Sequence, residues 1–235
     1  SLKARLCVQG NILSRKISRE LGVDFKEVGE LIVAFSEEEK ARLYELKKDA
    51  QDIGVAGLEI VDSLWLRKNE PNLNKDAIAA LYAKTAGIVS PYRLVYDLSE
   101  NAIRNGVELF TDRKVEGIVM KKYFEISTSR GVFRARFVIN AAGLFADKIS
   151  RIVGVGGFKI TPRKGEEFLL DKKREYLTNH LIFPLPTKTS KGILVIKTAD
   201  GNPMIGPSAE DVEDKLDLST TEEGFKKVLS QAKRL

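Results

Sequence analysis

The chain has 235 residues, of which 43% are hydrophobic and 31% are charged, so it is long enough to bury a core in one large or two modest domains. Its 39 basic and 33 acidic residues give a net charge of +6, but charges of both signs are mixed along the chain, which argues against nucleic acid as a partner. A single cysteine, Cys7, excludes an internal disulfide and a cysteine-built metal site, and no apolar run approaches the roughly 20 residues of a membrane-spanning helix. We therefore expect a globular protein without a metal.

The first half of the chain predicts alternating helices and strands. Gly22 follows an apolar helical pattern as a left-handed cap, Ser36 and Glu39 form a capping box, and Pro91 suits the first turn of a helix. In chain order, we predict a helix at 3–21, a strand at 28–35, a helix from 37 to about 53, a short helix at 59–69, a strand at 78–82, a turn region at 87–90 and a helix from 91 to about 106.

The second half predicts mainly short strands, at 107–110, 115–121, 124–128, 132–139, 164–171, 180–184 and 193–197. The last three can join the strands at 28–35 and 78–82 in one mixed sheet. The apolar run at 137–139 is typical of a strand that is buried on both faces. It leads through Ala141, Ala142 and Gly143, a turn nearly free of side chains, into a helix. The closing segment from Phe225 predicts another helix, which the chain leaves uncapped.

Several segments in a fixed order resemble the FAD-dependent D-amino-acid-oxidase-like oxidoreductases, and most of all the anaerobic type of glycerol-3-phosphate dehydrogenase. Each segment alone is common in α/β proteins, whereas the order is specific. The segments are Val138–Asp147, Thr161–Glu166, Phe183–Lys188 and Asp200–Pro207, joined by Ala86–Pro91 and the acidic stretch Ala209–Asp214. The fold class implied is mixed α/β, with part of a two-dinucleotide-binding flavin sheet and an interleaved substrate lobe built on an antiparallel or mixed sheet.

The resemblance implies FAD as the cofactor and a small anionic substrate. The residues that it places at the cofactor are Val115, Ala141, Ala142, Gly143, Thr198 and Gly201, and those that it places at the substrate are Arg163, Lys164 and Glu167. A cation suits a phosphate or carboxylate, although both Arg163 and Lys164 also fit the interpretation of charges at the rim of a site. His180, the single histidine, precedes a strand, where we expect a surface or hydrogen-bonded side chain rather than the catalytic base.

The Gly-x-Gly-x-x-Gly turn that holds a dinucleotide pyrophosphate does not occur in this sequence, so we expect a fragment with an incomplete FAD site. We assign 1–24 and 88–157 to a partial FAD-binding lobe, 25–87 and 158–218 to a substrate lobe, and 219–235 to a helix that returns to the FAD lobe. An unpaired strand edge at 137–139 also predicts self-association of the fragment or a loosely packed first helix.

The sequence leaves two classes of function open. The parent protein is expected to oxidise glycerol 3-phosphate to dihydroxyacetone phosphate by hydride transfer to the flavin, with L-2-hydroxyglutarate or an amino acid as alternative substrates. The alternative is a catalytically silent fragment that serves only as a binding module. We expect a cytoplasmic protein. A membrane or electron-transfer partner of the parent protein is compatible with this prediction. No residue of this chain is assigned as the catalytic base.

Overall fold

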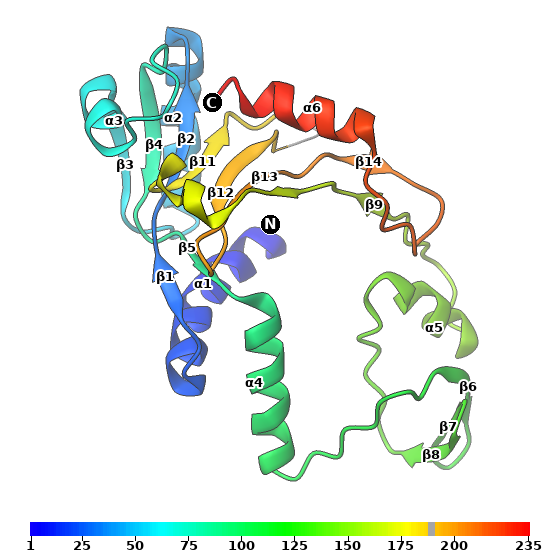
Figure 1. Ribbon diagram of the computed structural model, residues 1–235. Coiled ribbons are helices and arrows are strands. Elements are labelled where there is room, and N and C mark those ends of the chain that lie inside the picture. The colour runs from blue at the N-terminus through cyan, green and yellow to red at the C-terminus, as the bar shows by residue number, and fades with distance from the viewer. Residues whose placement is uncertain (188–190) are drawn as a thin grey trace. The chain divides into compact units, whose positions relative to one another are not determined.

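The computed structural model describes residues 1–187 and 191–235, which form two compact units (Figure 1). Unit 1 comprises Ser1–Asn101, Gly165–Ala209 and Ser219–Leu235. Unit 2 comprises Ala102–Lys164 and Glu210–Leu218. The division therefore groups the first helix with the large sheet, whereas the sequence assigned it to the cofactor lobe. Which unit serves cofactor and which serves substrate stays a prediction.

A seven-stranded mixed sheet forms the centre of unit 1 (Figure 1). Its strands, in spatial order, are β10 (Phe168–Leu169), β13 (Pro203–Gly206), β12 (Leu194–Lys197), β11 (Leu181–Pro184), β2 (Glu30–Ala34), β4 (Ala79–Ala83) and β3 (Leu58–Asp62). Only β11 and β2 run parallel; the other neighbours are antiparallel. The predicted mixed sheet is confirmed, and it has two more strands than the five that the sequence indicated.

Alternate residues of β2 supply the two cores that lie on opposite faces of this sheet. Leu31 and Val33 pack with Leu66 of α3 (Ser63–Asn69). Ala34, from the other face, packs with Leu43 of α2 (Glu37–Asp52). On the face shared with α3, Val228 of α6 (Glu222–Ala232) packs against Ile193 and Ile205. Helices therefore cover both faces of the sheet.

The predicted helix boundaries are confirmed where a capping residue marks them. Helix α1 (Leu2–Leu21) ends at Gly22, whose φ of 72° is left-handed and whose amide donates to the carbonyls of Ser18 and Arg19. Ser36 Oγ accepts from the amide of Glu39 at the start of α2 (3.1 Å). The Glu39 carboxylate in turn accepts from the amide of Phe35 (2.7 Å). Phe35 precedes the N-cap Ser36, so this half of the capping box uses the amide one residue before the usual one. Helix α4 (Pro91–Arg104) begins at its proline.

Unit 2 contains a three-stranded antiparallel sheet of β6 (Val115–Met120), β7 (Phe124–Thr128) and β8 (Gly131–Ala135). A 3₁₀ turn η1 (Gly143–Phe145) and α5 (Ala146–Ile152) follow it. The short strands β9 (Arg163–Lys164) and β14 (Glu210–Asp211) pair with each other. In unit 1, β1 (Phe25–Glu27) pairs with β5 (Gly87–Val89), and η2 (Lys172–Leu177) is a 3₁₀ helix.

The predicted buried strand at 137–139 is wrong. Phe137 and Ile139 are 83% and 89% exposed, and β8 ends at Ala135. No strand of the described residues pairs with this segment. An apolar run indicates that a segment tends to be buried, but only a neighbouring strand can supply the hydrogen bonds and the cover.

Four other local predictions are wrong for the same general reason, which is that strand pairing is decided by distant residues. Residues 59–62 belong to β3 rather than to a helix, because Ile60 pairs with Leu81. The predicted turn at 87–90 contains β5. The predicted strand at 107–110 is irregular, and the one at 164–171 divides into β9 and β10. Lys188, the last residue of one family-like segment, lies outside the described residues.

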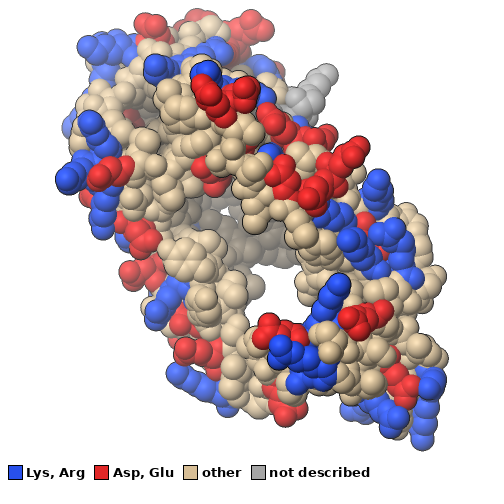
Figure 2. Space-filling model, turned by 45° about the vertical axis from the view of Figure 1, so that its right-hand side comes forward, with Lys and Arg blue, Asp and Glu red and all other residues tan. Residues whose placement is uncertain are grey.

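No helix among residues 1–187 and 191–235 combines the length and the apolar character that a membrane crossing requires. Basic and acidic side chains are interspersed over the face of the molecule that Figure 2 shows. The helix predicted from Phe225 is present as α6, which begins at Glu222 behind the cap Thr221 and ends at Ala232.

Candidate functional site

The turn predicted to approach the cofactor lies in unit 2, and its Gly143 is the first residue of η1. Ala141 and Gly143 are exposed and Ala142 is half-buried. Gly143 has a φ of 53°, and a Cβ built on it would meet no atom within 4 Å. The turn therefore leaves open space on its outer side, which fits the close approach of a ligand to the backbone.

Asn140 holds this turn in shape from within. Its Oδ1 accepts from the amide of Ala142 (3.3 Å), and its Nδ2 donates to the carbonyl of Ala146 (2.8 Å). The amide of Phe145 donates to the carbonyl of Ala142 (2.9 Å). These local bonds from an asparagine replace the hydrogen bonds that a strand would have supplied.

A buried ion pair lies beneath the same turn. The Asp147 side chain is 2% exposed, and Lys215 Nζ donates to its Oδ1 (2.7 Å) and to the carbonyl of Leu144 (2.6 Å). The amide of Ile160 donates to the other carboxylate oxygen (3.2 Å). The hydrogen bond from Lys215, supported by that from Ile160 and opposed by burial, lowers the pKa of Asp147 to about 2. Asp147 is therefore ionised at neutral pH, and its contact with Lys215 joins the 210–218 segment to the turn.

The two predicted substrate cations both face aspartates of that segment. Lys164 Nζ lies 2.9 Å from Asp217 Oδ2, and the side chain is only 12% exposed. Arg163 Nη1 lies 3.8 Å from Asp211 Oδ1 and is half exposed. An anionic substrate at either cation would have to share it with, or displace it from, a carboxylate.

Glu167, the third predicted substrate residue, is exposed and belongs to unit 1. Its neighbour Glu166 is the buried one, and it accepts from the amide (2.8 Å) and the hydroxyl (3.1 Å) of Thr221. Glu166 thus fixes the start of α6. Neither its burial nor the partnership of Asp147 with Lys215 was expected, and the only signal for Lys215 was its place beside the acidic stretch.

The remaining predicted cofactor residues lie at strand ends. Val115 begins β6 opposite Thr128, in unit 2. Thr198 and Gly201 form the turn between β12 and β13 in unit 1, where the Gly201 amide donates to the Thr198 carbonyl (3.0 Å) and Gly201 has a φ of 93°. Their roles at the cofactor stay predictions.

His180 is hydrogen-bonded within the fold, as predicted. Its Nδ1 lies 2.7 Å from Glu70 Oε1, and the same oxygen accepts from the amides of Asn179 (2.8 Å) and His180 (2.6 Å). The imidazole packs beside the rings of Trp65 and Tyr82, with centroids 5.6 and 5.3 Å away. This arrangement anchors the start of β11. No group of three or more residues suited to hold a metal occurs in the part of the chain that the structure describes.

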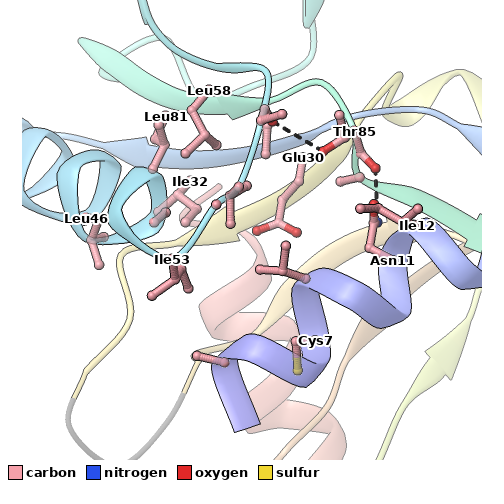
Figure 3. Close-up of a pocket in the computed structure, with 18 of the residues that line it drawn as sticks. Cys7, Asn11, Ile12, Glu30, Ile32, Leu46, Ile53, Leu58, Leu81 and Thr85 are labelled. Carbon is pink, nitrogen blue, oxygen red and sulfur yellow. Dashed lines mark hydrogen bonds between the residues drawn. The ribbon is translucent and has the colours of Figure 1, made fainter. Parts of the chain in front are cut away.

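A cavity of about 530 Å³ lies within unit 1 between α1, the end of α2 and one face of the sheet (Figure 3). Its wall is mainly apolar and includes Ile12, Ile32, Leu46, Ile53, Leu58 and Leu81. The Glu30 carboxylate points into it from β2 (Figure 3). Burial raises the pKa of Glu30, an effect that the charge of Lys191 partly offsets. The sequence did not indicate this cavity, because it depends on where α1 packs.

Comparison with known proteins decides the family. The family model described as FAD dependent oxidoreductase matches residues 1–235. The chain belongs to the FAD-dependent oxidoreductase family. This confirms the predicted family, its mixed α/β fold and FAD as the cofactor of the family.

Three relatives illustrate the range of this FAD-dependent family. The chain is 39% identical over all its 235 residues to a glycerol 3-phosphate dehydrogenase of Caloramator mitchellensis, and covers 49% of that protein. It is 30% identical over 225 residues, 89% of the chain, to the mitochondrial L-2-hydroxyglutarate dehydrogenase of Homo sapiens, and covers 48% of it. The structure matches the dithionite-reduced L-α-glycerophosphate oxidase of Mycoplasma pneumoniae with FAD bound, at a TM-score of 0.92 and 25% identity, over 100% of this chain and 63% of the other. The chain therefore spans about half the length of these curated relatives.

Proposed function

We propose that this chain is part of an FAD-dependent dehydrogenase that oxidises glycerol 3-phosphate to dihydroxyacetone phosphate. The observation that carries the proposal is the 39% identity, over the whole chain, to a protein named as a glycerol 3-phosphate dehydrogenase. In the reaction, the carbon that bears the hydroxyl loses a hydride and the hydroxyl loses a proton. FAD, when bound, supplies the hydride acceptor.

The residues of the chain fit a part of the cofactor site. The bare, open turn at Ala141, Ala142 and Gly143 would lie against FAD, with Asn140 and the Asp147–Lys215 pair holding its backbone in place. The exposed apolar side chains of Phe137 and Ile139 support the proposal that further protein, from the parent chain or a second copy, covers this segment.

Arg163 and Lys164 are the proposed binders of the substrate phosphate. Both cations lie on β9 and pair with carboxylates, and the partial exposure of Arg163 leaves it accessible to an anion. Charge-assisted hydrogen bonds to a phosphate are each worth about 1.5–3 kcal/mol, so losing one would raise KM roughly 10–100-fold.

The first experiment is a titration of FAD into this chain and into a chain extended upstream through a glycine-rich turn. We expect tight binding by the extended chain only, and loss of the flavin absorbance when glycerol 3-phosphate is added without oxygen. Failure of both chains to bind FAD would contradict the assignment of the cofactor site. Binding without reduction by glycerol 3-phosphate would contradict the substrate alone.

The second candidate substrate is L-2-hydroxyglutarate, because the chain is also 30% identical to a dehydrogenase of that compound. Both substrates are hydroxylated anions, and they differ in carrying a phosphate or two carboxylates. Reduction of the flavin by L-2-hydroxyglutarate and not by glycerol 3-phosphate would select this candidate.

The variant Arg163→Met in the extended chain then tests the phosphate contact. We expect KM for glycerol 3-phosphate to rise at least about 10-fold while FAD still binds. Lys159→Met is the matched control, since Lys159 is an exposed cation in the same unit. An unchanged KM in Arg163→Met would remove Arg163 from the proposed site.

A further inference from the structure

We propose that the cavity of unit 1 binds a small organic cation, a protonated amine on an apolar body, with Glu30 as its counter-ion. This is a second binding site, beyond the oxidoreductase function proposed above. It rests on the shape of the cavity, the composition of its wall and the state of the Glu30 carboxylate.

The size and wall of the cavity suit an apolar body of drug-like size. Its volume of about 530 Å³ falls within the range of roughly 300–1,000 Å³ that is typical of small-molecule sites. Helix α1 contributes Val8 and Ile12, the segment after α2 contributes Ile53, and the sheet contributes Ile32 and Leu81. In Figure 3, Ile32 and Ile53 lie on one side of the Glu30 carboxylate and α1 lies on the other. An apolar ligand would gain by leaving water here.

Most polar groups of the wall are already bound to one another. Arg15 Nη2 donates to the carbonyl of Thr85 (2.5 Å) and to Asn11 Oδ1 (3.0 Å), and its Nε lies 3.7 Å from the Glu27 carboxylate. Asn11 Nδ2 donates to the same Thr85 carbonyl (3.2 Å). Nη2 of Arg15 is therefore satisfied by the chain itself, and its buried Nε, which makes no hydrogen bond among the described residues, has the Glu27 carboxylate as its counter-charge.

The Glu30 carboxylate, in contrast, makes no hydrogen bond and no ion pair among the described residues, although it points into the apolar space. A half-buried carboxylate without a hydrogen-bond donor is unfavourable even with the charge of Lys191 nearby, and a ligand that brings an ammonium group would supply the hydrogen bonds and a charge in contact. The carboxylate therefore favours a cationic ligand over an anion such as glycerol 3-phosphate.

Binding should depend on pH through Glu30. Burial raises the pKa of this carboxyl, so the carboxylate is lost at a higher pH than for an exposed glutamate, and amine binding weakens as the pH falls through that pKa. The other charged groups near the carboxylate are Arg15 on α1, which lines the cavity, and Lys191 before β12. Helix α2 and β4 add no charged side chain to the wall.

The test is a calorimetric titration of the chain with 2-phenylethylamine and with 2-phenylethanol, which have nearly the same shape and differ in charge. We expect the amine to bind at least about 10-fold more tightly, and to shift the methyl resonances of Ile32, Leu46 and Leu81. Equal affinity for the alcohol would overturn the proposal, because it would show an apolar cavity without charge selection. Absence of binding by the amine would overturn it as well.

The variant Glu30→Gln should lower the amine affinity about 10-fold and leave the alcohol unaffected. The matched control is Glu59→Gln, on β3 of the same sheet, whose carboxylate is exposed and paired with Lys84 at 2.7 Å. If Glu30→Gln does not fold, Ala50→Leu decides, because Ala50 lines the cavity and the larger side chain should narrow it and weaken amine binding. Unchanged amine affinity in either folded variant would refute the site.

Discussion

The two units of this chain differ in how their apolar side chains are placed. Unit 1 buries Leu31, Val33 and Leu43 completely within layers of helix and sheet. In unit 2, Ile118 is the one buried hydrophobic residue among those described, whereas Phe137, Ile139 and Leu218 are each more than 80% exposed. Unit 2 instead depends on polar contacts such as the Asp147–Lys215 pair. Unit 1 therefore carries its own core, while unit 2 has an apolar surface suited to further contacts.

The largest effect on the free energy of unfolding is expected from Leu31→Ala, because Leu31 lies in the core of unit 1. The change opens a cavity at a residue with 0% exposure, and similar changes cost about 2–5 kcal/mol of unfolding free energy. Urea unfolding followed by circular dichroism measures it. The control is Leu218→Ala, where the side chain is 91% exposed and the expected loss is below about 0.5 kcal/mol. Equal losses in the two variants would contradict the difference in burial between the units.

A smaller and local effect is expected from Lys215→Met. The variant removes the donors to Asp147 and to the Leu144 carbonyl, so amides of the turn from 141 to 147 should exchange faster while those of β2 stay protected. Hydrogen exchange measured by NMR follows the amides of the turn and those of β2 separately. Lys159→Met, an exposed lysine of unit 2, is the control. Unchanged exchange at the turn would show that the ion pair does not hold it.

The same pair predicts a pH dependence. The pKa of Asp147 is lowered from 3.8 to about 2, so its contribution to stability is present above pH 3.8 and is lost as the pH falls to about 2. In Lys215→Met the pKa should move back toward 3.8. A carbon-13 titration of the carboxyl group measures both. A wild-type pKa at or above 3.8 would contradict the structure of the pair.

The smallest effect on stability is expected from Ile139→Ser, because this side chain is already 89% exposed. The unfolding free energy should change by less than about 0.5 kcal/mol, while any self-association of the chain should weaken. Sedimentation velocity over a range of concentrations tests the second point, with Val155→Ser, at 60% exposure in the same unit, as the control. A loss of several kcal/mol would mean that Ile139 is buried in solution.

Local signals in the sequence predicted the elements whose boundaries depend on nearby residues. Gly22 ends α1 and Ser36 begins α2 because caps act within a few residues of themselves. Five of the seven strands of the mixed sheet were also found from their apolar pattern, whereas β3 and β13 were not. The family followed from several segments in order, and the comparisons confirm it.

Features that join distant residues could not be predicted from the sequence, because they depend on the tertiary structure. Residues 59–62 pair with β4, and the apolar run at 137–139 stays exposed because no neighbour covers it. Asp147 meets Lys215, 68 residues later, and Glu30 faces a cavity whose opposite wall is α1. A pattern of residues states what a segment prefers to bury or to bond, whereas the partner that satisfies the preference is chosen by the packing of the whole chain.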